Sequence, residues 1–284
     1  MSELVQKEDD LGIEMILSVL WGSKYLIILI TALFAISSIY FSLQMPDKYR
    51  SSALIVVIDP SKNSGSSMLS RFGGLASMAG ISLPSSSGGD KSDLAVATIK
   101  SRDFFNKLIE DNDILPELYA AKNYNKNTQK LSYDNSYSYE KESWNKSDKN
   151  ITLRPTNQEV YAFYRGILNI GVEDKSGYMT ISITHVSPKF ANELIRLIVI
   201  EVNSITRQND LNESETALVY LKTLIGTVAY KEIKDSLSRL IEAQLETQML
   251  VNIREDDYLL KYIDQPFSPE NKYSPRRSLT VVMS

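Results

Sequence analysis

Residues 26–45 read Leu-Ile-Ile-Leu-Ile-Thr-Ala-Leu-Phe-Ala-Ile-Ser-Ser-Ile-Tyr-Phe-Ser-Leu-Gln-Met and carry no charged side chain. A helix of this length extends about 30 Å, which is the thickness of the hydrocarbon core of a bilayer. Lys24 and Asp47 are the nearest charged residues on either side. We therefore expect a first transmembrane helix over residues 25–45. This segment decides the fold, because the rest of the chain must then be arranged beside a membrane.

A cleaved signal peptide is the alternative interpretation of this segment. The apolar run is longer than the core of a signal peptide, which has about 7–15 residues, and a net acidic leader precedes it. Residues 1–24 are therefore expected to form a cytoplasmic N-terminal segment, with a short interfacial helix over residues 10–22. Basic residues are balanced across the span and leave its orientation open, but a long downstream domain can be translocated regardless of charge.

The composition excludes several classes of function. The 284 residues have a net charge of −4 and no cysteine, which argues against nucleic-acid binding and excludes disulfides and thiolate metal sites. His185 is the single histidine, so a multi-histidine metal site is impossible. Ser187 lies near it but is better explained as a helix cap, and the adjacent Asp256 and Asp257 point apart on a helix. We therefore expect no enzyme and no catalytic, cofactor-binding or metal-binding residues.

Residues 46–187 are expected to form an α+β domain. Residues 49–59 predict a strand, because β-branched side chains dominate their second half. Residues 61–92 are rich in Ser and Gly, which is typical of a loop, and they lack the Gly-Lys-Ser/Thr of a phosphate-binding loop.

Two helices are expected between residues 92 and 115, with Ser92 or Asp93 capping the first and Ser101 capping the second. Residues 119–150 are polar and are expected to be irregular. Their aromatic residues are Tyr133, Tyr137, Tyr139 and Trp144. These rings suit stacking on sugars, but tyrosines are also common in exposed loops, and both interpretations remain open.

The rest of this domain carries clear local signals. Thr156 and Glu159 have the spacing of a capping box, in which each side chain accepts from the other residue's amide. Residues 167–174 and 178–184 alternate apolar and polar side chains on either side of a turn that contains Gly177. This pattern predicts a β-hairpin with one covered face.

Residues 188–265 are expected to be an extended helical region. Ser187 can cap it and Pro188 suits its first turn, and no further proline occurs before Pro266. A single helix of this length would exceed about 100 Å, far longer than helices in compact domains. We therefore expect a helical hairpin whose tip lies near Gly226, with the polar run 208–215 as the competing break.

The C-terminal residues predict a return to the membrane. Three prolines make residues 266–275 a proline-rich linker. Residues 276–284 begin with two arginines and then turn apolar, which resembles the start of a truncated second transmembrane helix.

This order of parts resembles the Wzz family of chain length determinants, also called polysaccharide co-polymerases. The resemblance covers nearly the whole chain, and its motifs are specific only in combination and in order. Besides the acidic leader and first span, the stretches that carry it are Tyr49–Val57, Gly74–Ser82, Lys100–Phe104, Val186–Asn192 and Pro269–Arg277.

The resemblance implies a membrane-proximal mixed α/β base domain with a long periplasmic helical hairpin, flanked by transmembrane helices. It implies a bacterial inner-membrane protein whose main domain is periplasmic and which forms ring-like homo-oligomers in contact with membrane lipid. Such a protein regulates the chain length of a surface polysaccharide such as O-antigen, as a scaffold that works with a Wzy-type polymerase. The growing glycan is a further candidate partner.

Two other functions remain open. One is a co-polymerase adaptor of a capsule or exopolysaccharide export system, partnered with a cytoplasmic tyrosine autokinase. The related kinases carry a phosphate-binding loop after the second span. The other is an export adaptor between two membranes or a sensor ectodomain.

Overall fold

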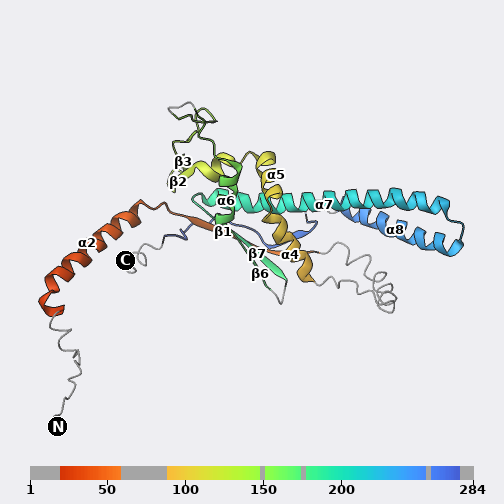
Figure 1. Cartoon of the computed structure of the whole chain (residues 1–284), viewed down its shortest axis with the longest axis horizontal. Coiled ribbons are helices and arrows are strands. Elements are labelled where there is room, and N and C mark those ends of the chain that lie inside the picture. The colour runs from red at the N-terminus through yellow and green to blue at the C-terminus, as the bar shows by residue number, and fades with distance from the viewer. Residues whose placement is uncertain (1–19, 59–87, 148–150, 174–176, 254–256, 276–284) are drawn as a thin grey trace, which may run out of the picture. The chain divides into compact units, whose positions relative to one another are not determined.

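The computed structural model describes residues 20–58, 88–147, 151–173, 177–253 and 257–275. The chain divides into two units (Figure 1). One comprises Met1–Pro46 with Ser274–Ser284, and the other, called the α/β unit below, comprises Asp47–Tyr273. Most of the leader and of the glycine-rich loop, and all of the expected second span, lie outside the described residues.

The first unit contains α2 (Lys24–Gln44), which has no charged residue after its first position. The Thr31 hydroxyl donates to the carbonyl oxygens of Ile27 and Ile28 at 2.9 and 3.1 Å, so its hydrogen is shared within the helix. By length and composition, α2 is able to cross a membrane. The apolar helix expected over residues 25–45 is thus present, and its passage through a membrane stays a prediction.

The α/β unit is built on a four-stranded antiparallel sheet with the order β6–β7–β1–β8. Strand β1 (Tyr49–Val57) pairs with β7 (Tyr178–His185) on one side and with β8 (Leu260–Asp264) on the other. Strand β6 (Leu168–Val172) pairs with β7, and Gly177 has a positive φ in the turn between them. The strand expected from residue 49 and the hairpin expected around Gly177 are confirmed.

The core forms where helix α7 (Pro188–Thr227) crosses this sheet. Every second residue of β1 is buried from Tyr49 to Ile55, as expected for a strand with one covered face. Roughly the first four turns of α7 carry most of its buried residues. The fully buried aliphatic side chains of this layer include Ile55, Met179, Ile181, Ile183, Leu194, Ile195, Ile198 and Val202.

Three shorter helices complete the core: α4 (Gly88–Ile99), α5 (Arg102–Asn112) and α6 (Asn157–Ile167). The Ser101 cap of α5 and the Thr156 capping box of α6 are both confirmed.

The cap expected at Ser92 or Asp93 is wrong, because α4 begins four residues before Ser92 and buries that side chain within the helix. Contacts of α4 with α7 and β1 outweigh the poor helix propensity of its leading glycines.

Helix α6 holds the end of α4 through two tyrosines. The Tyr164 hydroxyl donates to the carbonyl oxygen of Ile99 at 3.0 Å, and the Tyr161 hydroxyl donates to that of Lys100 at 2.7 Å. Both rings pack on Phe105 of α5. These bonds satisfy carbonyl groups that the last turn of a helix leaves free.

The expectation of irregular structure over residues 119–150 is wrong. After the π-helical turn η2 (Pro116–Ala120), strands β2 (Ala121–Asn125) and β3 (Lys130–Tyr133) form a hairpin. A smaller hairpin pairs β4 (Tyr137–Ser138) with β5 (Ser143–Trp144).

The turn between β2 and β3 is set by a side chain. The Asn125 side-chain oxygen accepts from the amides of Asn127 and Thr128, which is the chemistry of an Asx turn. The sequence analysis did not predict these strands, because they are polar and bury little apolar surface.

Helices α7 and α8 (Lys231–Ile253) form a hairpin in which α8 returns beside the distal part of α7 (Figure 1). Gly226 lies in the last turn of α7, and residues 228–230 make the turn. The Ser214 hydroxyl donates to the carbonyl oxygen of Gln244 at 3.0 Å and ties the two helices together. We call residues 204–253 the arm. The competing break at residues 208–215 is wrong, because α7 continues through it.

The second helix of the arm is shorter than expected. Helix to residue 265 was expected, but α8 ends at Ile253 and residues 260–264 form β8. Strand β1 has a second edge, and pairing it with β8 satisfies its backbone groups and buries Leu260. Helix α7 as a whole is therefore longer than α8, about 60 Å against about 35 Å, because the start of α7 serves the core and only its distal part pairs with α8 in the arm.

A buried asparagine fixes where the chain rejoins the sheet. The Asn203 side chain accepts from the amides of Leu259 and Leu260 at 3.0 and 2.7 Å and donates to the Leu260 carbonyl oxygen at 2.9 Å. Its exposed fraction is 1%. Nearby, the Tyr258 hydroxyl donates to Asp210 at 2.5 Å. Helix α7 thus provides hydrogen-bond partners to the start of β8.

We expect Asn203→Leu to lower the free energy of unfolding by about 3–4 kcal/mol, because two amides and one carbonyl group would be left buried without partners. Urea denaturation of a fragment spanning residues 47–273, which contains the whole core, measures the loss. Asn209→Leu, an exposed site on the same helix, is the control and should change stability by less than about 0.5 kcal/mol. Equal effects of the two substitutions would contradict the role given to Asn203.

Candidate functional site

The structure shows why His185 and Ser187 do not form a catalytic pair. The amide of Ser187 donates to Nδ1 of His185 at 3.1 Å, and the Ser187 hydroxyl accepts from the amide of Phe190 at 3.2 Å. Both side chains are buried. They organise the first turn of α7, which confirms the interpretation of Ser187 as a helix cap. Burial lowers the pKa of His185 to about 4, so the ring is neutral near pH 7.

The aromatic residues singled out in the sequence come together at one end of the α/β unit. Tyr137 and Trp144 face each other across the β4–β5 pair, with ring centroids 5.3 Å apart. Tyr133 at the end of β3 lies 5.4 Å from Tyr137 and stacks on Tyr139 at 5.6 Å with an angle of 8° between the rings. The four rings therefore form a continuous chain.

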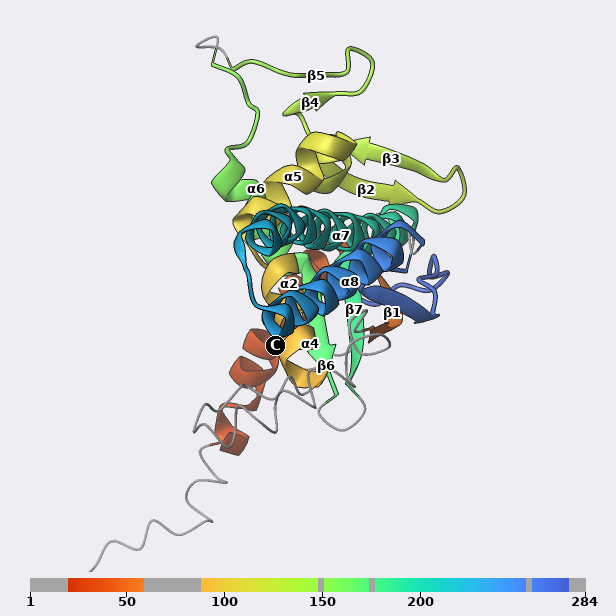
Figure 2. The same ribbon diagram turned by 90° about the vertical axis from the view of Figure 1, so that its right-hand side faces the viewer.

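Two rings of this chain, Tyr133 and Tyr139, line a cleft of about 520 Å³ beside the start of α7. The volume lies within the range of about 300–1,000 Å³ that is typical of small-molecule sites. We call it the aromatic cleft. Its lining comes from η2, the β2–β3 hairpin, Tyr139 and the first turns of α7. Figure 2 shows the β2–β3 hairpin beside α7. The lining includes Glu117, Tyr124, Gln129, Tyr133, Tyr139, Lys189 and Glu193.

Two contacts hold the hairpin against the rest of the unit. The Lys189 ammonium group donates to the Gln129 side-chain oxygen at 2.8 Å, which joins the β2–β3 turn to α7. The ring of Tyr124 meets the buried Tyr49 of β1 edge to face at 5.9 Å. The cleft is thus assembled from segments far apart in the sequence.

Burial and carboxylates set the electrostatics of the cleft. Burial raises the pKa of the half-buried Glu117, and the negative charges of Glu193 and Asp113 act in the same direction. Burial and the charge of Glu117 raise the pKa of Tyr133 to about 12, so this hydroxyl stays protonated at neutral pH. Lys130 and Lys189 also line the cleft, and both are exposed.

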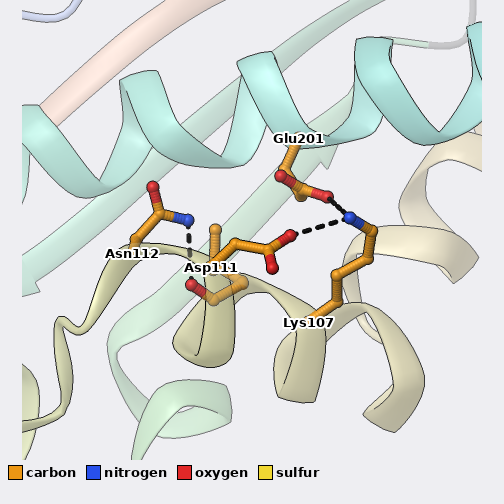
Figure 3. Close-up of polar contacts among 5 residues, drawn as sticks. Lys107, Asp111, Asn112 and Glu201 are labelled. Atoms are coloured by element: carbon orange, nitrogen blue, oxygen red, sulfur yellow. Dashed lines mark hydrogen bonds and ion pairs between the residues drawn. The ribbon is translucent and has the colours of Figure 1, made fainter.

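An ion pair fixes helix α5, which leads into this region, against α7. Figure 3 shows the Lys107 ammonium group between Asp111 at 2.7 Å and Glu201 at 2.9 Å. Hydrogen bonds to Asp111 and Glu201 raise the pKa of Lys107 above its usual value. The adjacent helix end is satisfied locally, since Asn112 donates to the Leu108 carbonyl oxygen. The position of η2, and hence of Glu117, follows from this attachment.

The two ends of the α/β unit are joined to each other. Asp47 and Lys272 form an ion pair at 3.1 Å, and the amide of Tyr273 donates to the carbonyl oxygen of Lys48 at 2.8 Å. The Arg50 guanidinium group stacks on the Tyr273 ring, 3.6 Å from its centroid. We call these five residues the terminal clamp. The chain enters and leaves the unit at the same place.

The described part of the chain holds no group of three or more His, Asp or Glu side chains able to bind a metal ion. The sequence flagged the tyrosines and Trp144, and the structure brings them together. The polar side of the cleft could not be predicted from the sequence. Its residues lie in ordinary polar stretches that no local pattern marks: Glu117, Gln129, Lys189 and Glu193.

Comparisons with known proteins support the resemblance seen in the sequence. Residues 9–112 match the family model of Wzz, the chain length determinant protein. No curated protein matches the chain. The motif stretches Val186–Asn192 and Pro269–Arg277 lie outside the matched residues.

Two solved structures show a distant likeness. A full-length bacterial polysaccharide co-polymerase is 15% identical, with a TM-score of 0.34 over 94% of this chain and 90% of that chain. A fragment of WzzB, a polysaccharide co-polymerase from Salmonella Typhimurium, is 14% identical, with a TM-score of 0.28 over 81% of this chain and 100% of that chain.

The buried His185 makes stability sensitive to acid. The unfolded ring binds a proton below pH about 6.5, but the folded ring does so only near pH 4, so acid favours the unfolded state between these values. Between pH 7 and pH 5, this residue should remove about 2 kcal/mol from the free energy of unfolding. In His185→Asn, the amide oxygen can accept from Ser187 without titrating, and this extra loss should disappear. If the free energy of unfolding fell equally in the two proteins between pH 7 and pH 5, His185 would not be the cause of the loss.

Proposed function

We propose that this chain, which carries a Wzz chain length determinant segment over residues 9–112, regulates the chain length of a bacterial surface polysaccharide such as O-antigen. The protein is anchored in the inner membrane by α2, with the α/β unit in the periplasm, and acts as an oligomeric scaffold beside a Wzy-type polymerase. It is not itself an enzyme. The family match is the observation that carries the proposal.

The terminal clamp supports a scaffold anchored at both ends. It brings Asp47, which follows α2, next to Tyr273, which precedes the apolar C-terminal residues. If residues 276–284 begin a second span, the two membrane segments leave the unit side by side. Such anchoring holds every copy in one plane and one orientation, which raises the effective concentration for association.

The arm supports association between copies. The hairpin leaves large apolar side chains exposed on both of its helices, including Val219, Tyr220, Leu240, Leu245 and Met249. Helices α7 and α8 bury few residues against each other, so these side chains are available to neighbours. Exposed apolar surface of this kind often marks a partner surface, and a cyclic arrangement would close it without a free edge.

Deletion of the gene should convert a polysaccharide with a preferred length into a short, unregulated ladder, with its sugar composition unchanged. Gel electrophoresis of the surface glycan reads this directly, and the intact chain supplied in trans should restore the preferred length. Loss of all polysaccharide would argue for an enzyme or a transporter. A changed amount that depends on a tyrosine kinase would favour the export adaptor.

The detergent-solubilised full chain should sediment as an oligomer in analytical ultracentrifugation. Val219→Glu combined with Met249→Glu should shift it toward smaller species, because both substitutions place charge on apolar arm surface. Glu242→Lys changes a side chain that is already polar and exposed on α8, and should leave the distribution unchanged. A strictly monomeric wild-type chain at high concentration would contradict the scaffold.

A further inference from the structure

The aromatic cleft is not used by the anchoring or the association described above. Three features set it apart from the remaining surface: a volume of about 520 Å³, a stacked pair of tyrosines at its wall, and a half-buried carboxylate within it. The second described cavity, between α4 and α7, has about 330 Å³ and no aromatic side chain in its lining. The aromatic cleft is therefore the stronger candidate for a ligand site.

We infer that the aromatic cleft binds a short, uncharged stretch of oligosaccharide. The inference rests on the proposed function, because it gives the α/β unit a direct hold on the polymer whose length is regulated. The ligand is identified by two properties of the cleft, its ring geometry and its charge.

The ring geometry fits the apolar face of a sugar. Tyr139 is 68% exposed, and its ring lies parallel to that of Tyr133 with the centroids 5.6 Å apart, so the ring is oriented by its neighbour and most of its surface is accessible. The C–H groups on one face of a pyranose pack on such a ring, and the phenol hydroxyl can bond to sugar hydroxyls. Tyrosine pays little conformational entropy on binding because it has two side-chain torsions, and stacking on Tyr133 restricts it further.

The polar lining fits hydroxyl groups. Glu117 and Glu193 are acceptors for sugar hydroxyls, and Gln129 offers an amide next to them. The Lys189 ammonium group is already bonded to Gln129. The lining thus combines aromatic side chains with polar groups that can orient a ligand, as in small-molecule sites.

The charge of the cleft argues against an acidic sugar. Glu117 is half-buried and already experiences the negative charges of Glu193 and Asp113. A uronic acid placed beside it would add a further like charge in a partly desolvated place, which is unfavourable. Lys130 and Lys189 also line the cleft, but both are exposed, so water screens their charges more than that of the half-buried Glu117. Neutral and N-acetylated sugars avoid this repulsion.

Binding is tested with the full chain in detergent micelles. The probes are maltotriose and triacetylchitotriose, which are neutral, and trigalacturonate, which is acidic. Saturation-transfer NMR should detect at least one neutral probe, and it should bind at least fivefold more tightly than trigalacturonate. Tyr139→Ala should weaken neutral binding by roughly tenfold. Glu117→Gln should strengthen trigalacturonate binding severalfold, because it removes the repulsion and keeps the shape.

Tyr230→Ala is the matched control, since Tyr230 is 71% exposed and lies in the turn of the arm, outside the cleft. It should leave binding unchanged. Absence of binding to both neutral probes would overturn the inference, as would preference for trigalacturonate or equal losses in Tyr139→Ala and Tyr230→Ala. Because the chain has no cysteine, Tyr139→Cys can also report a second copy in the cleft: efficient disulfide dimers would replace the saccharide with a protein partner.

The two proposals fail in different assays. Saccharide binding is read on purified protein, and length control is read on the surface glycan of cells. Loss of the preferred glycan length on gene deletion, without saccharide binding, would overturn the inference alone. Saccharide binding without any change in glycan length on deletion would overturn the proposed function and leave the site standing.

Discussion

The α/β unit depends on a single closure, the three hydrogen bonds between the Asn203 side chain and the backbone at Leu259 and Leu260. The chain leaves the core after Asn203, runs out along α7, turns, and returns along α8 before it reaches this point. Ordering such an excursion costs conformational entropy, and hydrophobic contacts within the arm are sparse. The closure compensates because the amide side chain satisfies two donors and one acceptor in a buried place, where unpaired groups would each be costly. It also sets the register of β8, since hydrogen bonds are directional and apolar packing is not.

Everything downstream of this closure follows from the position of β8. Its pairing with β1 covers the second edge of that strand and directs residues 265–273 back along the sheet. Ser51 then bonds to the carbonyl oxygen of Phe267, and the terminal clamp forms where β1 begins. The ends of the unit are thus joined by the same strand that carries the core. The two ends of the unit are therefore connected through a few residues of the terminal clamp and not through the arm.

The sequence predicted those features that depend on neighbours in the chain. Ser101, Thr156 and Ser187 cap helices because their side chains reach amides three residues away, and β7 alternates because one face is buried. Features that depend on distant partners were missed. Residues 260–264 have helical and strand character alike, and only the free edge of β1 decides between them. In the sequence, Asn203 looks like any polar residue within a helix, although its side chain makes the three hydrogen bonds of the closure. Tyr133 and Tyr139 of the aromatic cleft were visible in the sequence, but Glu117, Lys189 and Glu193 were not, because they come from η2 and α7, which are far apart in the chain.

Helix α7 links the aromatic cleft, the closure and the arm, because its first turns line the cleft, its middle carries Asn203, and its distal part forms one side of the arm. Such continuity invites the idea that a ligand in the cleft controls association of the arms. A ligand can shift a second site only if the protein has two arrangements that the ligand binds with different affinity. The start of α7 offers little freedom for a second arrangement: Phe190, Leu194 and Ile198 are buried against the sheet, and shifting them would open cavities in a close-packed core. Under the proposed function, the cleft therefore acts as a fixed holding point, and association of the arms does not depend on whether the cleft is filled.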